Sequence, residues 1–224
     1  MSNPAEVNLA RQVYVSRETI FKVMACCRDD HHRLLLALGR FGGLRIMSEI
    51  RHLRYCDFKE KVICIHQDTK TGAREVPLFG EIKEIFDRIV LGLGADYKPG
   101  DLVFTGLPSF RRRIFAAIRS AGVERWEKLF TNLRSSCITD MVERKYSEKF
   151  LDAMFGNSAF VRSRYYIQFR KDREYARALE ENEVLRKISV ESDAGIDIDS
   201  LPKEVLLVLR DLLVNRFGIG KQVG

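Results

Sequence analysis

A change in hydrophobic periodicity divides this sequence and leaves few folds open to it. Apolar residues recur at helical spacing up to about residue 53 and at alternating positions between residues 58 and 78. From Gly80 onward the helical spacing returns and continues for most of the chain. Because a period of about 3.6 residues indicates helices and a period of two indicates strands, we expect an α+β, mainly α-helical fold with a small three-stranded antiparallel β-sheet on one side.

Residues with strong capping preferences mark the expected helix ends. Ser16 is an expected N-cap, and Gly42 and Gly43 stop a helix predicted over residues 29–41. The KTG sequence at 70–72 is typical of a hairpin turn. Strands are expected at residues 58, 62–66 and 75–78, and further helices over residues 48–53, 80–92, 107–121, 131–145, 147–155 and 160–187.

The predicted organisation is one main domain followed by a short appendage. Residues 1–188 form the expected main domain, and residues 189–224 the appendage. Its first part, SVESDAGIDIDS, is acidic and poor in core residues, which indicates a linker. The sequence LPKEVLLVLRDLLVNRFG then predicts an amphipathic helix with Pro202 in its first turn. Its apolar face can be covered by the same domain or by a neighbouring protomer, and the sequence leaves both open.

Positive charge is concentrated in one part of the chain. The net charge is +7, and residues 105–187 hold 18 lysines and arginines against 11 acidic residues. The remaining residues balance at 20 against 20. A basic face of this kind neutralises backbone phosphates and releases their counterions, so we interpret it as directed at nucleic acid. A merely solvated basic surface is the alternative.

Cysteine usage and hydropathy indicate a cytoplasmic protein. The five cysteines are an odd number without CxxC pairs, and no stretch approaches the ~20 apolar residues of a membrane-spanning helix. We therefore expect no membrane partner. His52, Cys56, Cys64 and His66 lie within fifteen residues, but their spacing does not match a usual zinc finger. No metal or other cofactor is expected.

Three segments place a cation or a hydroxyl at the edge of a predicted element. In GGLRIMSEI, Arg45 follows a pair of helix-ending glycines, and in DTKTGAREVPL, Lys70 stands at a turn. The third segment runs from LFTNLRSSCITDM, which contains Arg134, through MFGNS, which contains Asn157, to RSRYYIQF. In the last of these, Tyr166 follows Asn157 by nine residues.

This order of motifs resembles the catalytic domain of tyrosine recombinases, or phage-type integrases, over about residues 16–169. The resemblance implies that Arg45 and Arg134 clamp a scissile phosphate, that Lys70 is the general acid and that Tyr166 is the nucleophile. It further implies a site-specific recombinase that cuts and rejoins double-stranded DNA through a 3'-phosphotyrosyl intermediate. Guanidinium groups suit this chemistry because they neutralise and orient phosphate oxygens with paired hydrogen bonds.

Tyr165 is the alternative nucleophile. Adjacent helical residues point about 100° apart, so only one of the two tyrosines can face the phosphate. The nine-residue spacing from Asn157 favours Tyr166.

The sequence departs from the family pattern at three positions. Thr131 stands where the family usually has histidine, and Asn157 stands where it has histidine or tryptophan. Glu49 lies four residues after Arg45, whereas the usual spacing is three. Because a threonine cannot act as a base near neutral pH, a catalytically impaired DNA-binding relic of the same fold is the main alternative function. A helical interaction module and a type IB topoisomerase-like activity are further alternatives.

DNA contacts are expected from two further groups of arginines. Arg111, Arg112 and Arg113 begin a predicted helix, and Arg162 and Arg164 precede the tyrosine pair. A solvated helix face is the alternative for the first three. The resemblance implies a homo-oligomer on DNA, a tetramer in the synaptic complex. The separate N-terminal DNA-binding domain of the family is expected to be absent from this chain.

Overall fold

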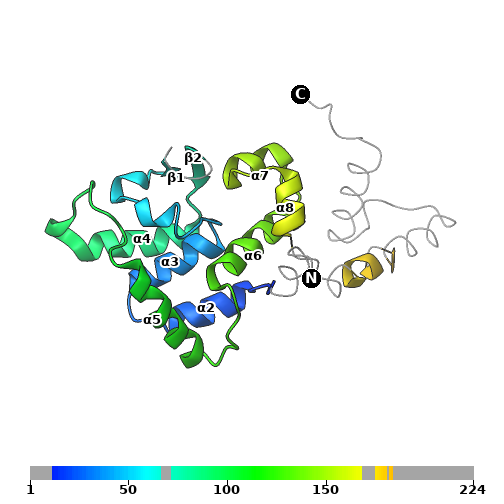
Figure 1. Ribbon diagram of the computed structural model, residues 1–224, viewed down its shortest axis with the longest axis horizontal. Helices are drawn as coiled ribbons and strands as arrows, with labels where there is room; N and C mark the ends of the chain where they lie inside the picture. The colour runs from blue at the N-terminus through cyan, green and yellow to red at the C-terminus, as the bar shows by residue number, and fades with distance from the viewer. Residues whose placement is uncertain (1–11, 67–71, 168–174, 181, 184–224) are drawn as a thin grey trace, which may run out of the picture. The chain divides into compact units, whose positions relative to one another are not determined.

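The computed structural model describes residues 12–66, 72–167, 175–180 and 182–183 (Figure 1). The chain divides into two units, Met1–Gln168 and Phe169–Gly224. The helices and strands named below all belong to the first unit. In the second unit residues 175–180 are helical, whereas the predicted linker and amphipathic helix lie outside the described residues.

Helices dominate the first unit, and their ends follow the expected caps. The side chain of Ser16 accepts a hydrogen bond from the N–H of Thr19, and the side chain of Asp29 accepts one from the N–H of His32. The helices are α2 (Arg17–Ala25), α3 (Asp30–Arg40), α4 (Gly80–Leu93), α5 (Leu107–Ser120), α6 (Leu129–Glu143), α7 (Glu148–Phe155) and α8 (Ala159–Tyr165). Short 3-10 helices cover Ile50–His52, Tyr55–Asp57 and Gly94–Asp96. The predicted helices between residues 17 and 155 are thus confirmed to within a few residues. None of the described helices is both long and apolar enough to cross a membrane.

Helix α3 is the central element of the core. It contacts α2, α4, α5 and α6, and in Figure 1 it lies between α4 and α6. Leu34, Leu35, Leu36 and Leu38 are all fully buried, and burying one such side chain stabilises the fold by about 1.5–3 kcal/mol. Its last residue, Arg40, is also buried. Arg40 forms an ion pair with Asp140 of α6 at 2.7 Å, which joins the two helices.

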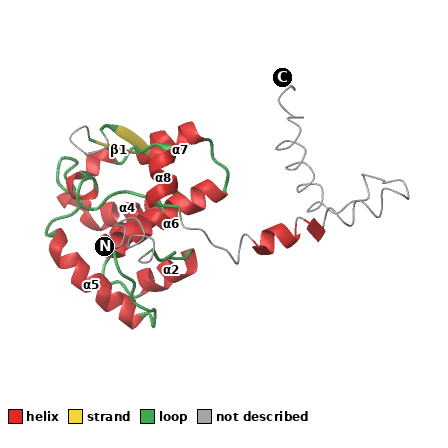
Figure 2. Cartoon of the chain, turned by 45° about the vertical axis from the view of Figure 1, so that its right-hand side comes forward, coloured by secondary structure: helices red, strands yellow, loops and turns green. Residues whose placement is uncertain are grey.

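The described β-sheet has two strands, so the expectation of three is wrong. Strand β1 (Val62–Ile65) pairs antiparallel with β2 (Arg74–Pro77), which packs against α7 (Figure 2). Phe58 makes only an isolated bridge with Ile63. Three residues separate Phe58 from β1, and the residues just before it wind into a 3-10 helix, so there is no length of extended chain to form a third strand.

The single helix predicted over residues 160–187 is also wrong, because α8 ends at Tyr165. The N–H groups of Tyr166 and Ile167 both donate to the carbonyl of Arg162, at 2.9 and 3.0 Å. Sharing one carbonyl in this way turns the chain out of the helix, and Tyr166 has a φ of −126°. Tyr166 therefore stands at a helix end and not within a helix.

Candidate active site

Arg134 is the buried centre of the site. It projects from α6 and is 2% exposed. Its Nη2 donates to the carbonyl of Phe155, at the end of α7, at 2.9 Å, and its Nη1 donates to the carbonyl of Gly43, after α3. The guanidinium thus joins three segments that are far apart in the sequence.

Gly43 makes this close packing possible. Its φ is +64°, a conformation that residues with a side chain rarely adopt, and a Cβ atom there would lie 2.5 Å from Cε1 of Phe155. Gly43, one of the two glycines predicted to end the helix, therefore also lets the end of α7 pack against the segment that carries Arg45.

The charge of Arg134 has no direct counterion among the described residues. No described carboxylate lies within ion-pair distance of it, and its Nε is buried without a hydrogen-bond partner within the described part of the chain. Burial and the nearby charge of Arg45 lower the pKa of Arg134 to about 10, so the group still carries its proton at neutral pH. A buried cation in this state is stabilised by an anion, which makes it a candidate phosphate site.

Arg45 is held beside Arg134 by Glu49. The Nη1 of Arg45 donates to Oε1 of Glu49 at 2.9 Å, and the backbone N–H of Arg45 donates to Oε2 at 2.8 Å. The side chain of Glu49 is fully buried, whereas that of Arg45 is 20% exposed. Burial favours a raised pKa for Glu49, but hydrogen bonds from Arg74 and from the Arg45 N–H hold that pKa below its ordinary value. The four-residue spacing therefore does not prevent Glu49 from supporting Arg45.

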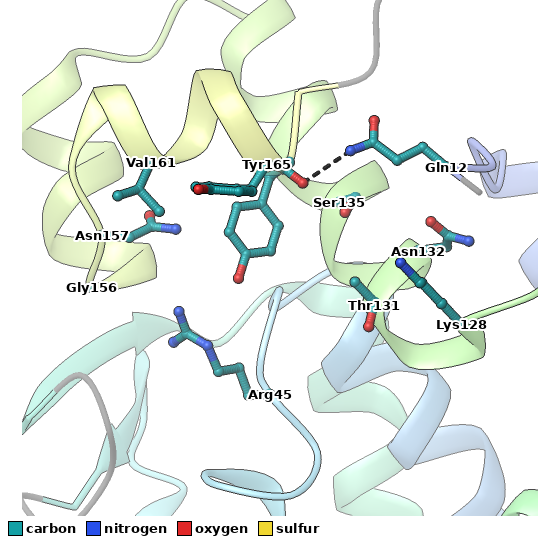
Figure 3. A pocket seen from close by; sticks show the side chains of 11 residues that line it. Gln12, Arg45, Lys128, Thr131, Asn132, Ser135, Gly156, Asn157, Val161 and Tyr165 are labelled. Carbon is teal, nitrogen blue, oxygen red and sulfur yellow. Dashed lines mark hydrogen bonds between the residues drawn. The ribbon is translucent and has the colours of Figure 1, made fainter. Parts of the chain in front are cut away.

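Tyr166 is half-buried and lies next to Arg134. The Cζ atom of Arg134 is 5.4 Å from the centre of the Tyr166 ring. Tyr165 is more exposed, at 42%, and its backbone carbonyl accepts a hydrogen bond from Gln12 at 3.0 Å (Figure 3). Of the two tyrosines, only Tyr166 has a ring contact with Arg134 among the described residues.

Two hollows of about 580 and 380 Å³ open at the site. Both are lined by Arg45, Lys128, Thr131 and Tyr166, and Arg134 lines the smaller one. In Figure 3, Arg45 enters the larger hollow from its loop, Lys128 and Thr131 enter it from the start of α6, and Asn157 enters it from the α7–α8 turn. The structure thus brings five of the six predicted catalytic residues to one place. The sixth, Lys70, lies outside the described residues.

Neutral polar groups stand at Asn157 and Thr131, the two positions where the resemblance implies a histidine or, for Asn157, a histidine or tryptophan. The side-chain Oδ1 and Nδ2 of Asn157 and the Oγ of Ser135 are buried without a hydrogen-bond partner within the described residues. The Nδ2 of Asn157 and the Oγ of Ser135 can donate to an oxygen of a bound phosphate, and the Oδ1 of Asn157 can accept from a water. Thr131 lines both hollows and adds a hydroxyl. Ser135 was not predicted, because a serine in the second turn of a helix has no distinctive sequence signal.

Lys128 is a cation at the site that the sequence did not indicate. It precedes α6 and has φ and ψ of 45° and 48°, a left-handed conformation that is uncommon for a residue other than glycine. This turn directs its side chain into the larger hollow beside Thr131 (Figure 3). A lysine just before a helix is common in proteins, so this signal could not have been found in the sequence.

The predicted DNA-binding arginines lie in different environments. Arg111, Arg112 and Arg113 are exposed on α5, and Arg111 also lines the smaller hollow. Arg164 is exposed on α8.

Arg162 is not available to DNA in this conformation, and the predicted phosphate contact there is corrected. The residue is 1% exposed, and its Nη1 forms an ion pair with Asp152 at 2.6 Å. It also binds the carbonyl of Asn157 and the carboxylate of Glu148. Arg162 therefore fastens α8 to α7 and supports the backbone of the turn that carries Asn157.

Among the described residues, no group of three or more histidines, cysteines, aspartates or glutamates is arranged to hold a metal ion. His66, one of the four residues considered for zinc, instead pairs with Asp57 at 2.8 Å.

The arrangement of these helices and the hairpin is the fold of tyrosine recombinase and integrase catalytic domains, which confirms the resemblance at the level of the fold. XerA recombinase is similar with a TM-score of 0.63 and 15% identity, over 75% of this chain and 63% of its own length. XerH recombinase bound to the palindromic difH substrate is similar with a TM-score of 0.56 and 21% identity, over 74% and 51%. The catalytic domain of bacteriophage HP1 integrase is similar with a TM-score of 0.51 and 20% identity, over 69% and 86%. The sequence matches no protein-family model and no curated protein.

Proposed function

We propose that this chain is the catalytic part of a DNA recombinase or integrase that cuts and rejoins DNA through Tyr166. One observation carries the proposal: Arg45, Arg134 and Tyr166, which lie on three separate segments, converge on the same hollow. The buried charge of Arg134 provides a site for a phosphate, and the phenol beside it provides a nucleophile.

In the proposed reaction the Oη of Tyr166 attacks a DNA phosphorus. A bond forms between Oη and phosphorus, the bond from phosphorus to the 5'-oxygen breaks, and the phenolic proton is released to solvent. The product is a 3'-phosphotyrosyl link and a free 5'-hydroxyl. Attack of a second 5'-hydroxyl on this link reverses the chemistry and reseals the DNA without ATP or a metal ion.

The arginines act on the charge that develops during attack. Arg45 and Arg134 stabilise the non-bridging oxygens, and losing one preorganised donor of this kind commonly lowers the rate about 10²- to 10³-fold. Lys70 protonates the leaving oxygen, the role that the family resemblance gives it. Thr131 and Asn157 donate neutral hydrogen bonds to the phosphate, and Lys128 adds a charge that the missing imidazoles do not supply.

The proposed partner is double-stranded DNA, contacted by the exposed Arg111, Arg112 and Arg113 of α5 and by the exposed Arg164 of α8. The XerH structure in a post-cleavage complex with its DNA is the fold neighbour that bears most directly on this part of the proposal. Assembly of four copies on two DNA sites belongs to the same proposal.

Replacing Tyr166 with phenylalanine tests the nucleophile. The protein is incubated with nicked suicide DNA substrates, and a covalent protein–DNA adduct that survives denaturant is measured. We expect the unaltered protein to form the adduct and Y166F to form none, because only the hydroxyl can make the bond.

Tyr165→Phe is the matched control. It removes a hydroxyl one residue away and should keep at least about half of the adduct, since this ring does not lie on Arg134. An adduct formed equally by Y166F would contradict the assignment. If the protein binds its own DNA target site but forms no adduct, the alternative of a catalytically impaired DNA-binding relic is favoured.

A further inference from the structure

Arg74, which the active-site chemistry does not use, lies at the first position of β2 and faces inward. It pairs with Ile65 of β1 and precedes the buried Val76 by two residues, so its side chain lies on the same face as that valine. The side chain is 6% exposed. An arginine at an inward position of a two-stranded hairpin needs internal acceptors, because burying an unpaired charge is costly.

Two of the acceptors of Arg74 are parts of the candidate active site. Its Nη2 donates to Oε2 of Glu49 at 2.9 Å, and its Nε donates to the carbonyl of Met154 at 2.9 Å. Glu49 is the carboxylate that also binds Arg45. The carbonyl of Met154 is next along the chain to that of Phe155, which binds Arg134.

The result is one continuous set of bonds. It runs from Arg45 through Glu49 to Arg74, and then through the end of α7 to Arg134. Arg74 connects the Arg45–Glu49 pair to the end of α7, which binds Arg134. In the sequence, its strand follows the segment that carries Lys70.

We propose that Arg74 is a positioning residue that sets the distance and orientation of Arg45 relative to Arg134. The inference rests on the proposed function. Arg74 does not line either hollow and acts through Glu49 and the α7 carbonyl. It also keeps Glu49 ionised, since three arginines face this buried carboxylate: Arg45 from its own loop, Arg74 from β2 and Arg134 from α6.

The loss of Arg74 has a consequence that a purely structural residue would not produce. With one cation fewer and the same burial, the pKa of Glu49 rises. As the pH falls through that raised pKa, Glu49 takes up a proton and releases Arg45. Cleavage by an Arg74 variant should therefore decline toward acidic pH in a range where the unaltered protein is insensitive.

Single-turnover cleavage of the suicide substrate by the full chain tests this inference. We expect R74M to lower the cleavage rate about 10- to 100-fold, the usual effect of removing a residue that orients another at an active site. DNA affinity should change by less than about threefold, because Arg74 does not face the hollows. The rate of R74M should fall as the pH is lowered, over a range in which that of the unaltered protein stays flat, because the pKa of Glu49 is higher in the variant. R74K, which keeps the charge but not the two-nitrogen geometry, should restore the flat profile and part of the rate.

Arg88→Met is the matched control, since Arg88 lies on α4 with a half-exposed ion pair to Asp30. It should leave the rate and its pH profile unchanged. If R74M cleaves with the unaltered rate and pH profile per folded molecule, the positioning role is overturned. If R74M does not fold, R74K decides: an unaltered rate overturns the role, and a reduced rate with unaltered DNA affinity supports it.

A second measurement separates this inference from the proposed function. Rotation of the Arg45 guanidinium about its Nε–Cζ bond is followed by NMR in the unaltered protein and in R74K. Slow rotation that becomes fast in the variant supports positioning even if no protein forms an adduct, in which case only the proposed function fails. Equal rotation rates in both overturn the positioning role.

Discussion

At the scale of the residue, the site depends on how Arg134 is enclosed. Two backbone carbonyls, of Gly43 and Phe155, hold its guanidinium, and the ring of Tyr166 lies over it. The carbonyls can approach only because residue 43 has no side chain. The glycine is thus as necessary to the geometry as the arginine.

Gly43→Ala tests this requirement. The left-handed conformation costs about 1–2 kcal/mol for a residue with a Cβ, and the clash with Phe155 adds about 1–3 kcal/mol. We therefore expect the free energy of unfolding, measured in urea, to fall by about 2–5 kcal/mol. Gly80→Ala is the control, because nothing lies within 4 Å of a Cβ at Gly80 and its φ is ordinary. It should change stability by at most about 1 kcal/mol, as an increase. Equal losses in the two variants would contradict the argument.

At the scale of the element, the corner between α7 and α8 places Asn157 and Tyr166. Ser147 caps α7, and Gly156 ends it with a φ of +61°. Arg162 then binds α8 back to Asp152 and Glu148 of α7. The short α8 that results delivers Tyr166 at its C-terminal end, above Arg134.

Arg162→Met should therefore weaken the corner. The free energy of unfolding is expected to fall by about 1.5–3 kcal/mol, the range for hydrogen bonds to charged groups. The loss stays in this range because Asp152 and Glu148 are half-exposed and regain water when the arginine is lost. Arg164→Met, on the exposed side of the same helix, should change stability by less than about 0.5 kcal/mol and weaken DNA binding instead. If R162M keeps full stability and loses DNA affinity, the direct phosphate contact first predicted for Arg162 is the better account.

At the scale of the whole molecule, charge is distributed unevenly over the helices. Arg111, Arg112 and Arg113 expose three adjacent cations on α5, one of which lines the smaller hollow. On α4, by contrast, Lys83 pairs with Asp87 and Arg88 with Asp30. Cations that are already paired release few counterions on binding DNA, so α5 should contribute more to affinity.

Salt dependence measures this difference. Replacing Arg111, Arg112 and Arg113 together with glutamine should reduce the slope of log affinity against log salt by about 2 to 3, roughly one for each DNA phosphate that is no longer neutralised. The control replaces Lys83 and Arg88 with glutamine and should leave the slope unchanged. Equal slopes for the α5 variant and the unaltered protein would place the DNA face elsewhere.

The helices from residue 17 to residue 155 could be predicted from the sequence because their causes are local. An apolar period and a capping side chain such as Ser16 or Asp29 act within one or two turns. The motif order likewise indicated Arg45, Arg134 and Tyr166, since each stands in a short distinctive segment.

Only the tertiary structure decided the features that depend on distant partners. Arg74 and Arg162 look like ordinary surface arginines in sequence, and each is buried because its acceptors come from another element. The predicted third strand is absent from the described sheet because Phe58 lies only three residues before β1. The chain there is too short to pair beyond the single bridge to Ile63. The sequence by itself therefore determined the helices up to residue 155 and indicated the candidate reactive groups. Packing between α3, α6, α7 and the hairpin decided which charges are buried, because burial depends on atoms that are far away along the chain.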